Sequence, residues 1–179
     1  MSNFLRNNFL NLFILLVLSL LLCGFQTTFW FQMFGHFPSP LLWLNLVLYL
    51  ILYRRSEESI FLIYFIALVI KPFTAMPIGI LWLTLLVLHT LMLFVKKRVF
   101  WPSTRYFLFA SLGLSLGYHI TYILISRWLD HNPTQINFFH RLLEIIFTTL
   151  SATPMYYLLT WVDRWTQKET LPESSGGEL

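Results

Sequence analysis

The stretch KPFTAMPIG, Lys71 to Gly79, lies between two strongly apolar segments, residues 60–70 and 80–95. It holds two prolines five residues apart, a glycine and a single cation. Each proline removes a backbone donor and clashes with the preceding helical turn, so a continuous helix through the stretch is disfavoured. The stretch therefore predicts a tight reversal between two apolar helices. Its cation, Lys71, lies near the hydrocarbon edge, where a charged group is costly and is usually paired or functional.

The composition around this reversal is that of a membrane protein. Of 179 residues, 57% are apolar and only 11% are charged, against about 25% charged in an average soluble domain. A spanning helix needs about 20 apolar residues, so we expect an all-α membrane protein, a compact bundle of about six transmembrane helices. Two of its six apolar segments are short, which leaves five spans as the alternative. The segments are residues 9–25, 41–53, 60–70, 78–95, 106–125 and 142–162.

Lysines and arginines are spread unevenly over alternate loops. With a cytoplasmic amino terminus, nine fall inside and three outside, which is the bias expected for cytoplasmic loops. Both termini are then cytoplasmic, which favours an even number of spans. We expect a six-span transmembrane domain over residues 1–166 and a disordered cytoplasmic tail over residues 167–179. The net charge of +4 is on this reading a topology signal, and it predicts no binding of nucleic acid. The three outer cations are Lys71, Arg127 and Arg141.

No catalytic or cofactor motif accompanies these spans. The sequence contains no glycine-rich phosphate loop and no CxxC, HExxH or GxSxG motif, so we expect no enzyme activity and no cofactor. The only cysteine, Cys23, excludes an internal disulfide. The residues before it loosely resemble a lipoprotein cleavage site, which is the alternative to a first span. Four histidines fall toward the outside, but their irregular spacing does not predict a metal site. They are His36, His119, His131 and His140.

Small and charged residues of the last two apolar segments are candidate packing positions. Gly113 and Gly117 form a GxxxG match, which lets two helices approach closely. Packing inside the bundle is the favoured interpretation, and dimerisation is the alternative. Glu144 can pair with Arg141, three residues earlier on the same helix face. Alternatively it pairs with Lys71, because the predicted topology puts both at the outer end and a paired charge is cheaper there than a lone one.

Two segments are predicted to lie at the membrane surface. Lys96, Lys97 and Arg98 form the strongest basic cluster. Its position beside the membrane predicts contact with anionic lipid head groups, and a protein partner is the alternative. Residues 26–40 hold five aromatic residues and end in two prolines. They are predicted to form a connector in the outer interface, the depth that aromatic rings prefer.

Residues 38–165 resemble MreD, the small inner-membrane rod-shape-determining protein of bacteria. An early span opens with PLLWLN, Pro40 to Asn45, and ends at Arg54. The reversal closes with MPIG, in which Pro77 and Gly79 match the family pattern D-L-x-S-G-x-P-L-G. Lysine stands at position 71, six residues before this proline, where the family usually has an aspartate.

The resemblance extends to the second half of the chain. The basic cluster after the fourth apolar segment corresponds to the family's basic turn. Pro154, followed by Asp163 and Arg164, is similar to the proline and the charged end of the family's last span. The pattern is short, and chain length, span number and topology contribute to the resemblance as much as any single residue does.

The resemblance implies a non-enzymatic subunit of the cell-wall elongation machinery in the bacterial inner membrane. Its expected partner is an MreC-like membrane protein. Through that partner it is linked to an MreB-like filament, a RodA-like glycosyltransferase and a penicillin-binding transpeptidase. An alternative from another class is a small-molecule binder resembling the substrate-binding subunit of energy-coupling-factor vitamin transporters. The candidate structural or partner-binding residues are Lys71, Pro77, Gly79, Gly113, Gly117 and Glu144.

Overall fold

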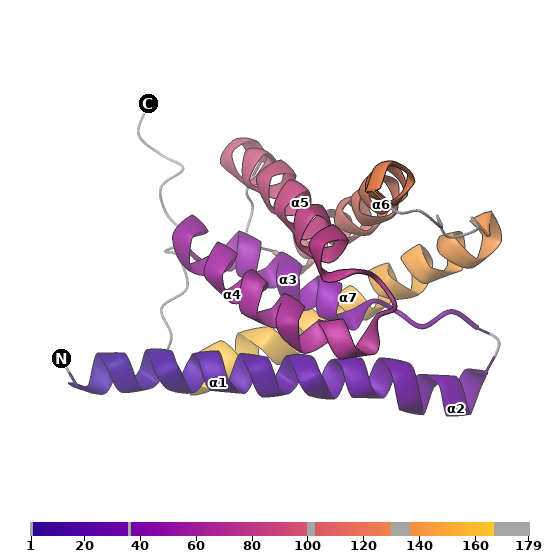
Figure 1. Ribbon diagram of the computed structural model, residues 1–179. Coiled ribbons are helices and arrows are strands. Elements are labelled where there is room, and N and C mark those ends of the chain that lie inside the picture. The colour runs from indigo at the N-terminus through magenta and orange to yellow at the C-terminus, as the bar shows by residue number, and fades with distance from the viewer. Residues whose placement is uncertain (1, 36, 100–102, 130–136, 167–179) are drawn as a thin grey trace.

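The chain folds into helices that are joined by short connections (Figure 1). A computed structural model describes residues 2–35, 37–99, 103–129 and 137–166, and the predicted tail lies outside them. The described residues contain no strand, which confirms the all-α prediction. The elements are α1 (Ser2–Gly24), η1 (Phe25–Phe29), α2 (Trp30–Phe34), α3 (Leu42–Tyr53), α4 (Ser56–Ile70), η2 (Lys71–Phe73), α5 (Ile78–Val99), α6 (Thr104–Leu129) and α7 (Phe138–Trp165).

α1, η1 and α2 form one long rod along an edge of the bundle (Figure 1). Residues 26–34, which belong to the predicted interface connector, are helical. No proline or glycine interrupts them, and the π-helical turn η1 carries the helix onward. The rod ends at Gly35, whose φ of 47° lies in the left-handed region that favours glycine.

Within the residues that the structure describes, four helical segments are long and apolar enough to cross a membrane. They are Phe9–Phe34, Ile78–Val99, Thr104–Leu129 and Phe138–Trp165. α3 has 12 residues and α4 has 15, so at 1.5 Å per residue they extend about 18 and 22 Å, against about 30 Å of hydrocarbon. Length and composition thus indicate a membrane protein and identify four of its helices as candidate spans.

The reversal predicted for residues 71–79 is confirmed. α4 ends at Ile70, the short η2 follows, and α5 begins at Ile78. Pro77 directly precedes α5, and its carbonyl accepts a hydrogen bond from the backbone N–H of Leu81 at 3.1 Å. A proline at the start of a helix loses no intrahelical bond, since the first N–H groups have no partner. The two prolines therefore bracket the turn.

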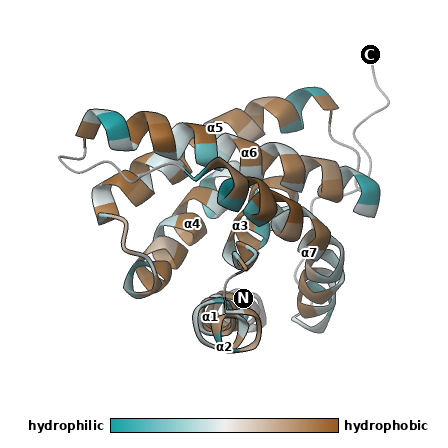
Figure 2. Cartoon of the chain, turned by 90° about the vertical axis from the view of Figure 1, so that its right-hand side faces the viewer, coloured by the Kyte–Doolittle hydropathy of each residue, from teal (hydrophilic) through white to brown (hydrophobic). Residues whose placement is uncertain are grey.

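α3 is the central helix of the bundle. All 12 of its residues are buried, and it packs against α1, α4, α5, α6 and α7. The surrounding helices expose large apolar side chains such as Phe109, Leu124 and Leu150, and apolar residues dominate their outer surfaces (Figure 2). A helix that is apolar on all sides is expected in a core or in a membrane. Here α3 is enclosed by protein, while its neighbours carry the outward apolar surface.

The helices alternate in direction, so the bundle has two distinct ends (Figure 1). At one end α3, α5 and α7 finish; Lys96 of α5 and Asp163 of α7 both contact Arg54 there. We call this the basic end, and the other the opposite end. The helices place the following described cations at or near the basic end: Arg54, Arg55, Lys96, Lys97, Arg98, Arg105 and Arg164.

Candidate functional site

Two charged residues are buried together at the basic end of the bundle. Arg54 follows the last turn of α3 and is 1% exposed, while Asp163 of α7 is 2% exposed. The backbone of Arg54 is extended, which ends α3 there, and its N–H still bonds the carbonyl of Leu50 at 3.1 Å. Charged side chains are rarely buried unless they are paired. Here the Arg54 guanidinium donates from Nη2 to Oδ1 of Asp163.

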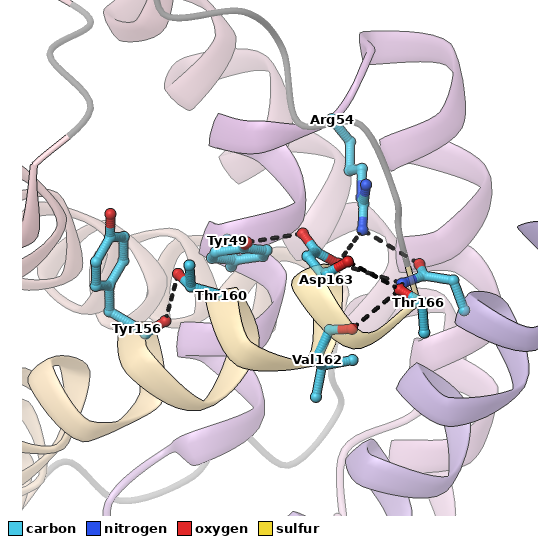
Figure 3. Close-up of polar contacts among 8 residues, drawn as sticks. Tyr49, Arg54, Tyr156, Thr160, Val162, Asp163 and Thr166 are labelled. Carbon is cyan, nitrogen blue, oxygen red and sulfur yellow. Dashed lines mark hydrogen bonds and ion pairs between the residues drawn. The ribbon is translucent and has the colours of Figure 1, made fainter. Parts of the chain in front are cut away.

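The carboxylate of Asp163 accepts hydrogen bonds from three side chains, which lie in α1, in α3 and directly after α3 (Figure 3). Besides Arg54, the amide of Asn11 in α1 donates to Oδ1 at 3.2 Å. The hydroxyl of Tyr49 in α3 donates to Oδ2 at 2.7 Å. Hydrogen bonds to a charged group are stronger than those between neutral groups. We call Asn11, Tyr49, Arg54, Asp163 and Thr166 the polar cluster.

Asn11 connects the rod of α1 to this pair. Its Oδ1 accepts from Nη2 of Arg54 at 3.2 Å, and its Nδ2 donates to the hydroxyl of Thr166 at 2.7 Å as well as to Asp163. Thr166 in turn donates to the carbonyl of Val162 at 3.0 Å. The side-chain amide of Asn11 therefore has a partner for each of its polar atoms, which a buried amide requires. Nε and Nη1 of Arg54 have none among the described residues.

Lys96 adds α5 to the same end of the bundle. Its ammonium donates to the carbonyls of Ile51 and Arg54, both at 2.8 Å. The last carbonyls of a helix lack intrahelical partners, and a cation near them is favourable. Lys96 thus caps α3. Of the three residues expected at lipid head groups, only Lys97 and Arg98 are exposed.

A second set of hydrogen bonds joins α3 to α6 and α7 in the middle of the bundle. The amide of Asn45 donates to the carbonyl of Thr148 at 2.9 Å and to the hydroxyl of Ser151 at 3.1 Å. Its Oδ1 accepts from the hydroxyl of Ser111 at 2.6 Å. The hydroxyl of Thr148 also accepts from the backbone N–H of Leu41, just before α3, at 2.9 Å. α3 is therefore held by polar contacts at both of its ends.

Charged residues at the opposite end are arranged partly as expected. The pairing of Arg141 with Glu144 is confirmed at 3.2 Å, and Nε2 of His119 lies 3.7 Å from Glu144. The alternative pairing of Glu144 with Lys71 is wrong: no ion pair joins these two described residues. Arg141 is one turn away on the same helix and already neutralises the carboxylate. Lys71 is half-buried where α4 ends.

The candidate glycines differ in their surroundings. A Cβ at Gly117 would lie 3.2 Å from Cδ2 of Leu88 in α5, whereas Gly113 and Gly79 have open space. Gly117 thus packs inside the bundle, as the favoured interpretation of the GxxxG match predicts. Neither space nor a positive φ requires glycine at 113 or 79. Of these three glycines, only Gly117 lies where packing against a neighbouring helix favours glycine.

Sequence patterns mark Arg54 and Asp163 only as the ends of spans, and they do not point to Asn11, Tyr49 or Thr166. A usable signal was present, since a lone ionisable group beside an apolar segment predicts a partner. That signal cannot say which partner: Asp163 lies 109 residues from Arg54 and 152 from Asn11. Only the packing of α1 and α3 against α7 brings them together.

The polar cluster is suited to holding helices together. Its carboxylate is neutralised by a guanidinium and accepts hydrogen bonds from an amide and a phenol, and these bonds join α1, α3 and α7. Among the described residues, no group of three or more His, Cys, Asp or Glu is placed to hold a metal ion. These features define a helical membrane protein with an internally bonded core. Comparisons with models of protein families, with curated proteins and with solved structures each find no match to this chain.

Proposed function

We propose that the protein is a non-enzymatic membrane scaffold of the MreD type, which helps to organise the bacterial cell-wall elongation complex by binding an MreC-like membrane protein. One observation carries the proposal. Arg54 and Asp163, the charged ends of the early and the last span in the resemblance to MreD, form a buried ion pair although 109 residues separate them. Two distant parts of the resemblance thus meet at one point of the fold.

The centre of the bundle, which is filled by α3, also supports a scaffold. α3 is entirely buried, and Asn45 and Tyr49 are bonded to neighbouring helices. A protein that carries a solute through its centre would need polar groups facing a water-filled path. A scaffold instead needs a rigid interior, which these contacts provide, and an outer surface on which partners assemble.

The proposal includes a topology. The basic end faces the cytoplasm, both termini are cytoplasmic, and the short α3 and α4 complete six spans in the inner membrane. The gathering of Arg54, Arg55 and the cations of α5 at one end supports this orientation. Single cysteines at Lys97 and at Arg127, in a Cys23→Ser background, test it. A membrane-impermeant thiol reagent applied to whole cells should label the second position and not the first.

Depletion in a rod-shaped bacterium is the functional test. Cells should become round, and the full-length chain should co-purify with the MreC-like protein of the same organism. Asp163→Asn should weaken both results, because it leaves Arg54 unpaired. Arg164→Gln is the matched control, since that neighbouring cation is exposed. Cells that keep their rod shape after depletion would contradict the proposal.

A second candidate function, the binding of a small molecule such as a vitamin, has one observation in its favour. His119 is 4% exposed, and neither ring nitrogen makes a hydrogen bond within the described structure. Tyr118 and Glu144 lie beside it. Mass spectrometry of the purified protein separates the two functions. A stoichiometric small molecule, lost in His119→Ala, would favour the binder; recovery of the MreC-like protein without such a molecule would favour the scaffold.

A further inference from the structure

A groove runs along the outward face of α5. It has a volume of about 420 Å³ and is lined by Leu86, Val87, Thr90, Leu91 and Phe94. Its only polar lining side chain is satisfied, because the hydroxyl of Thr90 donates to the carbonyl of Leu86 at 2.9 Å. Phe94 and Leu91 are 59% and 51% exposed. The groove is therefore open and apolar, and the side chains that line it offer no unused hydrogen-bonding group.

Two exposed cations lie at the end of this groove. Arg98 is four residues after Phe94 and Lys97 is seven after Thr90, so a helix of 3.6 residues per turn places both on the groove side. The Arg98 guanidinium lies 4.6 Å from the centroid of the Phe94 ring, which holds it at the groove's last residue. Lys96 instead faces inward and caps α3. Neither Lys97 nor Arg98 forms an ion pair within the described part of the chain, so the apolar groove opens toward two uncompensated positive charges at the basic end.

We propose that this groove binds one anionic phospholipid, with an acyl chain along Leu86 to Phe94 and the phosphate at Lys97 and Arg98. Charge complementarity identifies the occupant. A guanidinium can hold a phosphate with two parallel hydrogen bonds, and an ammonium adds a point charge. Cations at the membrane surface favour anionic over zwitterionic lipids. A partner helix would fill the apolar part but would need acidic residues at its end to compensate both cations, whereas an anionic phospholipid combines the two parts in one molecule.

The test uses the full-length chain in detergent micelles doped with equal amounts of phosphatidylglycerol and phosphatidylcholine. Lipid that stays with the protein after gel filtration is quantified by mass spectrometry. We expect about one phosphatidylglycerol per chain, retained roughly tenfold over phosphatidylcholine, because two cations contribute to its binding. The double variant Lys97→Gln/Arg98→Gln should abolish the preference. Arg105→Gln, an exposed cation at the same end on α6, should keep it.

A second variant tests the groove itself. Thr90→Trp fills its middle and should reduce retained phosphatidylglycerol severalfold, with the thermal midpoint of the protein unchanged since the residue is exposed. Equal retention of the two lipids by the wild type would overturn the proposal. So would an equal loss in Arg105→Gln, or full retention in Thr90→Trp. A dimer seen by native mass spectrometry and dissociated by Thr90→Trp would show that a second copy occupies the groove, and would also overturn it.

Discussion

Replacing Asp163 by asparagine removes the charge that compensates Arg54 but keeps the size of the side chain. The guanidinium would then be buried, at 1% exposure, without a counter-ion. Breaking a buried pair by removing one partner costs about 3–5 kcal/mol, because the remaining charge stays desolvated. Domain stabilities are about 5–15 kcal/mol, so Asp163→Asn should remove at least about a fifth of the free energy of unfolding.

The double variant Arg54→Met/Asp163→Leu separates charge burial from simple loss of contacts. It removes both buried charges together and replaces them with apolar groups, a change that is often close to neutral. Asn11 and Tyr49 would still lose partners, at about 1 kcal/mol for each hydrogen bond. Three such bonds are lost, two of Asn11 and one of Tyr49, so we expect the double variant to lose about 3 kcal/mol, well below the sum of the two single losses.

These differences in the free energy of unfolding can be measured on the purified protein in a mild detergent, by adding increasing amounts of a denaturing detergent. Arg164→Gln is the control, because this cation neighbours Asp163 but is exposed. The reasoning would be refuted if Asp163→Asn were within about 0.5 kcal/mol of the wild type, the usual range of surface changes. It would also be refuted if the double variant lost the sum of the two single losses, since residues in contact should not be additive.

Three further outcomes follow from the same structure. Lys96→Met should lower the free energy of unfolding by about 2 kcal/mol, because two carbonyls at the end of α3 lose a charged donor. Lys97→Met should leave it unchanged, and titration of each variant with denaturing detergent compares the two. Gly117→Leu should cost about 1–3 kcal/mol by overpacking against α5, whereas Gly113→Leu, facing open space, should not; their thermal midpoints can be compared directly. Gly79→Ala should leave stability equal or raise it by about 0.5–1 kcal/mol, since the helix gains an alanine; a lower thermal midpoint would contradict the structure there.

Local rules predicted the parts of the fold that depend on neighbouring residues. Two prolines mark the turn after Ile70, and a spacing of three residues brings Arg141 to Glu144. The helical state of residues 26–34 was not predicted, because the preference of aromatic rings for the interface does not determine the backbone conformation. Only Gly35 supplies a stop signal, and the chain stays helical until it.

The candidate site was harder to predict because its contacts join distant segments. The inward direction of Lys96 could have been predicted from the sequence, because Lys96 lies seven residues after His89 and so on the same buried face of α5. The pairing of Arg54 with Asp163 could not have been predicted from helix periodicity. It depends on α3 lying beside the last part of α7, and helix periodicity alone does not fix which helices are neighbours.

The enclosure of α3 has a consequence for how the protein is made. Asp163 is synthesised 109 residues after Arg54. α3 can pack against α1 as soon as both are made, but the guanidinium of Arg54 stays without its counter-ion until the last part of α7 arrives. Chains truncated before Asp163 should therefore keep an unpaired cation at the end of the central helix and be recognised and degraded as unassembled.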